Sequence, residues 1–222
     1  MQVFYAKDDI EACLTDAFVN RYRSYRLKDV ALTGILLARP EDELVRKQIL
    51  PHLEFWHYRS DYYTDFFCCG YIPVQFVNDA KPVGVTIDGL KWGFSLRAFV
   101  ELADEIEKQT GWHYSGADPC LILANAYFDG HKAHLDFRRS IRINFREAIK
   151  DKAIATPTEL ADSVFEFAKH VNENSTDPVW EFSDKTGVKL IKRGLKDTFI
   201  DWLPKSLKPS AKAAFQFVVH EN

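Results

Sequence analysis

Two pairings of histidine with aspartate are the residues of this sequence that could do acid–base chemistry. His57 precedes Asp65 in and beside an aromatic run, and His134 lies two residues before Asp136. A histidine beside a carboxylate can act as a general acid or base, so these four residues are the candidates for a hydrolase or nuclease site. However, the sequence has no G-x-S-x-G, P-loop or G-x-G-x-x-G motif. A non-catalytic protein is therefore the main expectation, and an enzyme is the alternative.

A metal site is not expected around the histidines of residues 131–136. His131 and His134 differ by an odd number, so on a strand their side chains point to opposite faces. His134 and Asp136 share a face, but catalytic zinc usually has three protein ligands. We predict no metal and no cofactor.

Cys68 and Cys69 are adjacent within the aromatic run. One of them would be a reactive thiol if His57 or Arg59 lowered its pKa. Neighbouring strand residues point to opposite faces, however, and buried cysteines behave as small hydrophobic residues. We expect both thiols to be inert.

The stretch 133–145 alternates apolar and polar residues, which predicts a strand with one buried face and one polar face. On the polar face, Arg138 and Arg142 form a candidate site for a phosphate, a carboxylate or a protein partner, because arginine matches these groups geometrically. The alternative is a solvated face on which Asp136 and Arg138 form an ion pair. The predicted polar face comprises His134, Asp136, Arg138, Ser140, Arg142 and Asn144.

The segment 185–212 is basic, with eight lysines and arginines against two aspartates. Such a segment could contact nucleic acid, dock on the acidic remainder of the chain, or be solvated. Its candidate binding residues are Lys189, Lys192, Arg193 and Lys196.

Composition indicates an ordinary globular protein. Of the 222 residues, 46% are hydrophobic and 27% are charged, and the net charge of −3 gives no general attraction to polyanions. No stretch approaches the ~20 apolar residues of a membrane-spanning helix. The beginning of the sequence lacks the apolar core of a signal peptide, and four cysteines without a C-x-x-C fit a reducing compartment. We expect a cytoplasmic protein.

The fold should be organised around a hairpin in residues 119–145. Cys120 to Phe128 is almost uniformly apolar, as in a strand covered on both faces. Asp129-Gly130 follows, which predicts a two-residue type I′ turn. That turn would pair Phe128 with His131 and place Asn125 opposite His134.

Further elements follow from apolar periodicity and helix caps. Pro51 should break the helix that begins near Pro40, and Ser95 and Thr156 should cap later helices. The expected helices begin near residues 8, 41, 96 and 157, and the expected strands cover 30–38, 62–71, 85–87 and a region from Val179 to Ile191.

From residue 30 to residue 150 the expected elements follow the order strand, helix, strand, helix, strand, strand, helix. It resembles a thioredoxin-like fold, in which a mixed sheet ends in an antiparallel hairpin, although Ala38-Arg39-Pro40-Glu41 stands where the redox motif would be. A Rossmann-like, doubly wound three-layer sheet is the competitor. We predict a mixed α/β core domain over 1–172 and a small basic α+β appendage, 173–222, packed on it.

These observations favour a cytosolic accessory or recognition protein that binds a protein partner. The run HYRSDYYTDFFCCGY, residues 57–71, is similar to stretches in uncharacterised bacterial proteins encoded near anti-phage ATPases. That resemblance implies a role in an anti-phage defence complex and assigns no residue a function.

Overall fold

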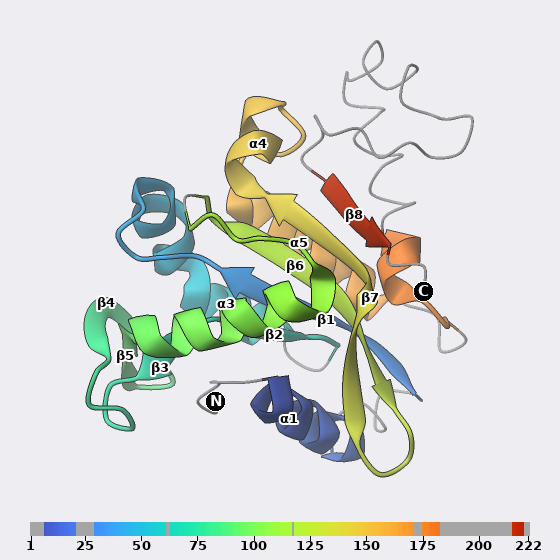
Figure 1. Ribbon diagram of the computed structural model, residues 1–222. Coiled ribbons are helices and arrows are strands. Elements are labelled where there is room, and N and C mark those ends of the chain that lie inside the picture. The colour runs from blue at the N-terminus through green and yellow to red at the C-terminus, as the bar shows by residue number, and fades with distance from the viewer. Residues whose placement is uncertain are drawn as a thin grey trace.

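A five-stranded mixed sheet in the order β2-β1-β6-β7-β8 is the centre of the fold (Figure 1). β1 and β2 are parallel, and every other neighbouring pair is antiparallel. The structure is a computed structural model, and it describes residues 7–20, 29–60, 63–116, 118–170, 175–182 and 215–219. The predicted mixed α/β class is confirmed. The strands are β1 (Val30–Leu37), β2 (Asp65–Cys68), β6 (Cys120–Phe128), β7 (Ala133–Asn144) and β8 (Phe215–Val219).

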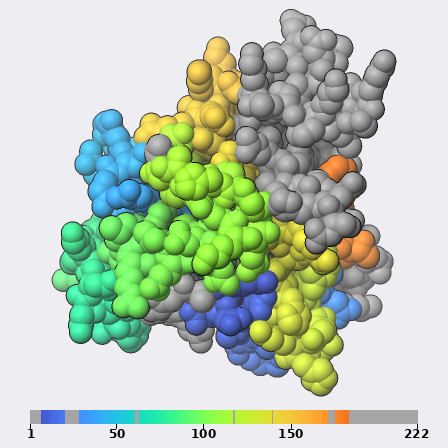
Figure 2. Space-filling model, in the orientation of Figure 1, coloured from blue at the N-terminus to red at the C-terminus, as the bar shows by residue number. Residues whose placement is uncertain are grey.

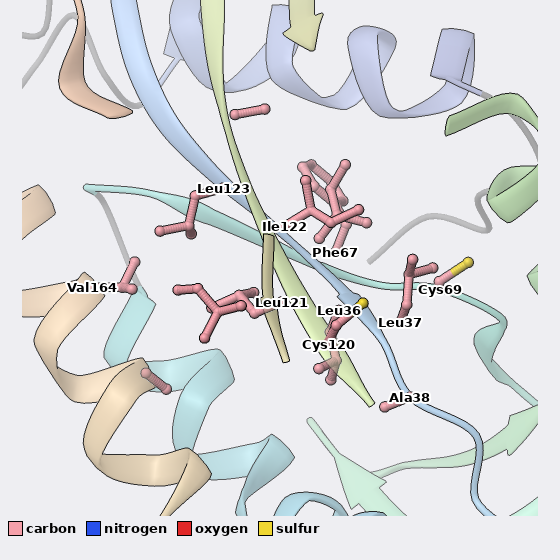
Figure 3. Packing of buried hydrophobic residues seen from close by; sticks show 14 of the residues in the cluster. Leu36, Leu37, Ala38, Phe67, Cys69, Cys120, Leu121, Ile122, Leu123 and Val164 are labelled. Carbon is pink, nitrogen blue, oxygen red and sulfur yellow. The ribbon is translucent and has the colours of Figure 1, made fainter. Parts of the chain in front are cut away.

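Helices cover both faces of this sheet. On one face lie α1 (Lys7–Asn20) and α3 (Leu96–Thr110), in front of the sheet in Figure 1 and across the face shown in Figure 2. On the other lie α2 (Leu53–Ser60) and α5 (Pro157–Lys169), while α4 (Phe145–Lys150) follows β7 directly. Leu121 of β6 points toward the side of α5, and its neighbour Ile122 points to the opposite side (Figure 3).

Aromatic contacts join the layers. Phe18 of α1 stacks on Phe128 of β6, with ring centroids 5.3 Å apart. On the opposite face Phe66 of β2 meets Trp56 of α2 and Phe165 of α5 edge-on. The apolar run of β6 is buried on both sides, as expected for an interior strand.

The predicted helix signals act as expected. The Ser95 hydroxyl accepts a hydrogen bond from the Ala98 amide, and Gly111 ends α3 with a φ of 66°. The Thr156 hydroxyl accepts from the Glu159 amide at the start of α5. Pro51 lies in a 3₁₀ turn (Leu50–His52) between a π-helical segment (Val45–Ile49) and α2, so the predicted break is confirmed.

The prediction of one strand over residues 62–71 is wrong, because the chain changes sheets at Gly70. Within the described residues, β2 covers 65–68, and Gly70 then turns with a φ of 78°, a conformation that favours glycine. Tyr71 begins a separate antiparallel sheet in the order β3-β5-β4. Its strands are β3 (Tyr71–Pro73), β4 (Lys81–Ile87) and β5 (Leu90–Phe94).

The β6–β7 hairpin is confirmed, but its predicted register is wrong. Phe128 pairs with Ala133, so the loop has four residues, 129–132, and Asn125 pairs with Asp136 rather than with His134. The Asp129 carboxylate accepts hydrogen bonds from the amides of His131 and Lys132, both at 2.7 Å. These two hydrogen bonds stabilise the four-residue loop, which the chain forms in place of the predicted type I′ turn.

An irregularity in β7 divides the predicted polar face. Asn125 pairs with Asp136, but the next β6 residue, Ala124, pairs with Ser140, so residues 137–139 have no partners on β6. Paired residues lie on the same face of a sheet. His134 and Asp136 therefore lie on the α2/α5 face, whereas Ser140, Arg142 and Asn144 lie on the α1/α3 face.

The outer edge of β7 is covered by two different elements. Near the loop, the Thr15 hydroxyl and the Glu11 carboxylate of α1 accept hydrogen bonds from the amides of Ala133 and Leu135. Beyond the irregularity, β8 pairs with residues 139–143. These contacts occupy edge groups that could otherwise pair with another chain.

The segment 175–182 packs on β6 through Asn125, which is fully buried. The Asn125 amide donates to Asp177 at 2.7 Å, and its oxygen accepts from the Val179 amide at 3.0 Å. Residues 178–182 are helical, so the strand predicted to begin at Val179 is wrong there, and the rest of it lies outside the described residues. The division of the chain at residue 172 stays a prediction.

Candidate functional site

His57 and Tyr58 of α2 share one carboxylate, that of Asp88 in the turn between β4 and β5. His57 Nε2 lies 2.9 Å from Asp88 Oδ2, and the Tyr58 hydroxyl donates to Asp88 Oδ1 at 3.0 Å. Ile87 pairs with Leu90, and Asp88 and Gly89 have φ values of 51° and 75°. This tight two-residue turn fixes the position of the carboxylate. We call Phe55, His57, Tyr58 and Asp88 the α2 surface.

The hydrogen bonds reinforce the ordinary charge states of Asp88 and Tyr58 at neutral pH. The bond from Tyr58, together with the nearby His57, lowers the pKa of Asp88, and the same bond with the Asp88 charge raises the pKa of Tyr58. At neutral pH the surface therefore presents an ionised carboxylate and a protonated phenol.

A small pocket lies directly beneath His57. It has a volume of about 30 Å³, and it is formed where α2, β2 and the three-stranded sheet meet. A water molecule needs roughly 10–15 Å³ by such a measure, so the pocket can hold about two water-sized groups. The side chains that line it are Leu53, Trp56, His57 and Ser60 from α2, Phe66 and Cys68 from β2, and Tyr71, Ile87 and Trp92 from the small sheet.

The polar groups of the pocket differ in their hydrogen bonding. The Ser60 hydroxyl donates to the His57 carbonyl at 3.0 Å, and the Tyr71 hydroxyl donates to the Ala38 carbonyl at 2.8 Å. The indole N–H groups of Trp56 and Trp92 are buried and have no acceptor among the described residues. Pairing of buried donors is the rule in proteins, so two exceptions around one pocket need an explanation.

The pocket does not activate its cysteine. Burial raises the pKa of the Cys68 thiol to about 12, and burial also raises that of Cys69. A thiol in this state is protonated at neutral pH and is a poor nucleophile. In the described part of the chain, neither the His57 ring nor the Asp88 carboxylate is hydrogen-bonded to a serine or cysteine side chain.

The four candidate acid–base residues are not brought together. Asp65 pairs with Thr33, which places it on the α1/α3 face, whereas His57 is on α2 at the other face. His134 and Asp136 are on β7, which is three strands from β2 in the sheet. Three strand spacings amount to roughly 14 Å, so Asp65 cannot act on one substrate atom together with His134 and Asp136.

The remaining candidates each have local partners or lie outside the described residues. His134 Nε2 lies 3.3 Å from Asp129, and Arg138 forms a two-point ion pair with Asp136, as the solvated alternative predicts. The half-buried Arg142 lies over the ring of Trp112, 4.6 Å from its centroid, on the opposite face from Asp136. The anion-binding role of Arg138 and Arg142 stays a prediction. The basic residues Lys189, Lys192, Arg193 and Lys196 lie outside the described residues.

Sequence reasoning found His57 but missed Asp88 and both pocket tryptophans. Asp88-Gly89 between two alternating apolar runs was a usable signal, because it is the dipeptide that forms tight hairpin turns. The tryptophans give no such signal, since a lone buried tryptophan is an ordinary core residue.

Comparisons with protein-family models, with curated proteins and with solved structures found no match. Among the residues that the structure describes, no three His, Cys, Asp or Glu side chains are grouped to hold a metal ion. In the same residues, no helix is both long and apolar enough to cross a membrane.

Proposed function

We propose that this protein is a non-catalytic accessory or recognition protein that binds a protein partner through the α2 surface. One observation carries the proposal: Tyr58 is 58% exposed, yet its hydroxyl is held by Asp88. Tyrosine is among the residues that dominate binding energy at protein interfaces. A ring that is already fixed loses little conformational freedom on binding.

Neighbouring groups support this assignment. Phe55 lies three residues before Tyr58, on the same side of α2, and its side chain is also exposed. The His57 ring lies 5.3 Å from that of Tyr58. Two aromatic anchors beside a fixed carboxylate combine apolar contact with a directional acceptor, as is usual at such interfaces.

The proposed setting is a bacterial anti-phage defence complex. The support for it is the resemblance of residues 57–71, a range that includes two residues of the α2 surface. The partner is then expected to be a component of such a complex. Identification of the captured partner therefore tests the proposed setting.

The binding proposal is tested with the full chain as bait in the native host. The protein captured by the wild type is purified, and its affinity is measured for Phe55→Ala, Tyr58→Ala and Tyr58→Phe. Each alanine variant should raise Kd at least about tenfold, since interface anchors contribute roughly 2 kcal/mol or more to the binding free energy. Tyr58→Phe keeps the ring and should lower the affinity less than Tyr58→Ala does.

Phe76→Ala is the matched control, because Phe76 is also 58% exposed but lies in the turn after β3, outside the α2 surface. Its affinity should equal that of the wild type. Full affinity in a Phe55→Ala/Tyr58→Ala double variant would show that the α2 surface is not the contact.

A further inference from the structure

The pocket beneath His57 is lined by two tryptophans whose indole N–H groups are buried hydrogen-bond donors. Neither donor has an acceptor among the described residues. The two residues, Trp56 and Trp92, are each only 2% exposed. A buried polar group that is left unpaired is destabilising, because it has lost its hydrogen bonds to water. Both indoles line the same cavity, which is therefore the place where an acceptor group would meet them.

The surroundings indicate which acceptor fits. Among the described residues that line the pocket there is no lysine or arginine, and the ionised Asp88 carboxylate is hydrogen-bonded to the lining residue His57. An anion would lose its hydration there without meeting a fixed cation, and it would be repelled by Asp88. An uncharged oxygen keeps the hydrogen bonds and avoids that repulsion.

The size of the pocket restricts the ligand further. About 30 Å³ admits a group of one or two heavy atoms beyond the lining, not an entire drug-sized molecule. The ligand must therefore insert one end, and the rest of it must extend outward. Beside its polar groups, the lining contains Leu53, Phe66 and Ile87, which offer apolar contacts to the carbon chain that carries the oxygen.

We propose that this pocket binds the terminal uncharged carbonyl or amide group of a ligand, with the indole N–H groups of Trp56 and Trp92 as donors. This site goes beyond the proposed partner contact and does not depend on it. The carbonyl group has two sources, a free small amide or the side-chain amide of a polypeptide, and both present the same oxygen to the tryptophans.

The test is a titration of the full chain with small ligands. Binding is monitored through the indole N–H signals in ¹H–¹⁵N NMR spectra. The chain has five tryptophans, so each signal can be assigned by one tryptophan-to-phenylalanine substitution. The ligands are propionamide, N-acetyl-glutamine N-methylamide and propionate. Both amides, or one of them, should shift the Trp56 and Trp92 signals saturably, and propionate should bind at least several-fold more weakly.

The two amides distinguish the sources. Saturation by propionamide indicates a site for free small amides, and saturation by the glutamine compound alone indicates a polypeptide side chain. The proposal is overturned if neither amide shifts these signals, if propionate binds equally well, or if the exposed Trp180 shifts to the same extent. No partner protein is needed, so failure here is separate from failure of partner binding.

Trp92→Phe provides a second measurement, because it removes one donor and keeps most of the aromatic volume. It should weaken amide binding several-fold, with the Trp56 signal reporting that the fold is retained. Trp112→Phe is the matched control, since the Trp112 indole N–H is also buried, likewise has no acceptor in the described part of the chain, and does not line the pocket. Unchanged amide affinity in Trp92→Phe would overturn the proposal.

Discussion

At the scale of single residues, buried polar side chains connect parts of this fold that are far apart in the sequence. Glu11 of α1 is only 4% exposed, yet it accepts from the Leu135 amide and forms ion pairs with Lys7 and Lys132. Asn125 similarly connects β6 to Asp177 and Val179. In both cases one side chain satisfies groups that burial would otherwise leave unpaired.

Glu11 should make stability depend on pH. Its burial alone raises its pKa, but the Leu135 amide and the two lysines lower it by more, so the net pKa is lowered. The unfolded chain therefore binds this proton more readily. The stabilisation is complete above the unfolded pKa of about 4.3 and is lost as the pH falls through the folded-state value.

The measurement is the free energy of unfolding in urea, from pH 7 to pH 3, for the wild type and Glu11→Gln. The variant should be about 1–3 kcal/mol less stable at pH 7. The difference should shrink toward pH 3. Glu101→Gln, which removes an exposed pair with Arg97 on α3, should change stability by less than about 1 kcal/mol at any pH. A Glu11→Gln deficit of equal size at pH 3 and pH 7 would exclude this role.

At the scale of elements, the α2/α5 face depends on a glycine in the middle of a strand. Gly34 of β1 pairs with Phe66 of β2, and a Cβ at position 34 would clash with the Phe66 ring. The missing side chain lets the Phe66 ring lie over β1, where it also meets Trp56 and Phe165. This contact joins β1 and β2 to α2 and α5.

Gly34→Ala should therefore lower the free energy of unfolding by about 1–3 kcal/mol through overpacking. Phe66→Leu should be destabilising alone but should cost less in the Gly34→Ala background, because the smaller side chain relieves the clash. Urea unfolding of the two single variants and the double variant gives the coupling energy. Strictly additive losses would mean that the two residues do not compete for the same space.

The sequence predicted elements better than it predicted contacts between them. Helix caps at Ser95 and Thr156 and the break at Pro51 are local effects, and all three were confirmed. The hairpin register was not predictable, because Asp129 lengthens the loop and α1 binds the β7 amides. The irregularity at residues 137–139, which separates Arg142 from Asp136, likewise left no signal in the alternation of residue types.

The same limit applies to the candidate site. His57 was identified from its residue type, but its partner Asp88 is 31 residues further along the chain. The pocket needs α2, β2 and the small sheet together, so no single stretch of sequence encodes it. Sequence patterns report which elements form, while sites of this kind arise from how the elements pack.

At the scale of the whole molecule, the central sheet is built from distant parts of the chain. The order strand, helix, strand, helix, strand, strand, helix is present up to residue 150, with the small sheet inserted after β2. The thioredoxin-like relationship stays a prediction. β8 then extends this sheet beyond the hairpin, pairing residues 215–219 with residues 139–143.

This pairing should protect one edge of β7 in solution. In an antiparallel pair, alternate amides of a strand point to each neighbour, so about half of the amides at 139–143 depend on β8. Phe217→Pro, opposite Ile141, introduces a residue that sheets tolerate poorly and should free these amides. Hydrogen–deuterium exchange followed by peptide mass analysis should show faster uptake at 139–143. Uptake in β1 should stay unchanged, because β6 still covers that strand. If the uptake at 139–143 equals that of the wild type, β7 is the true edge of the sheet and β8 does not pair with it in solution.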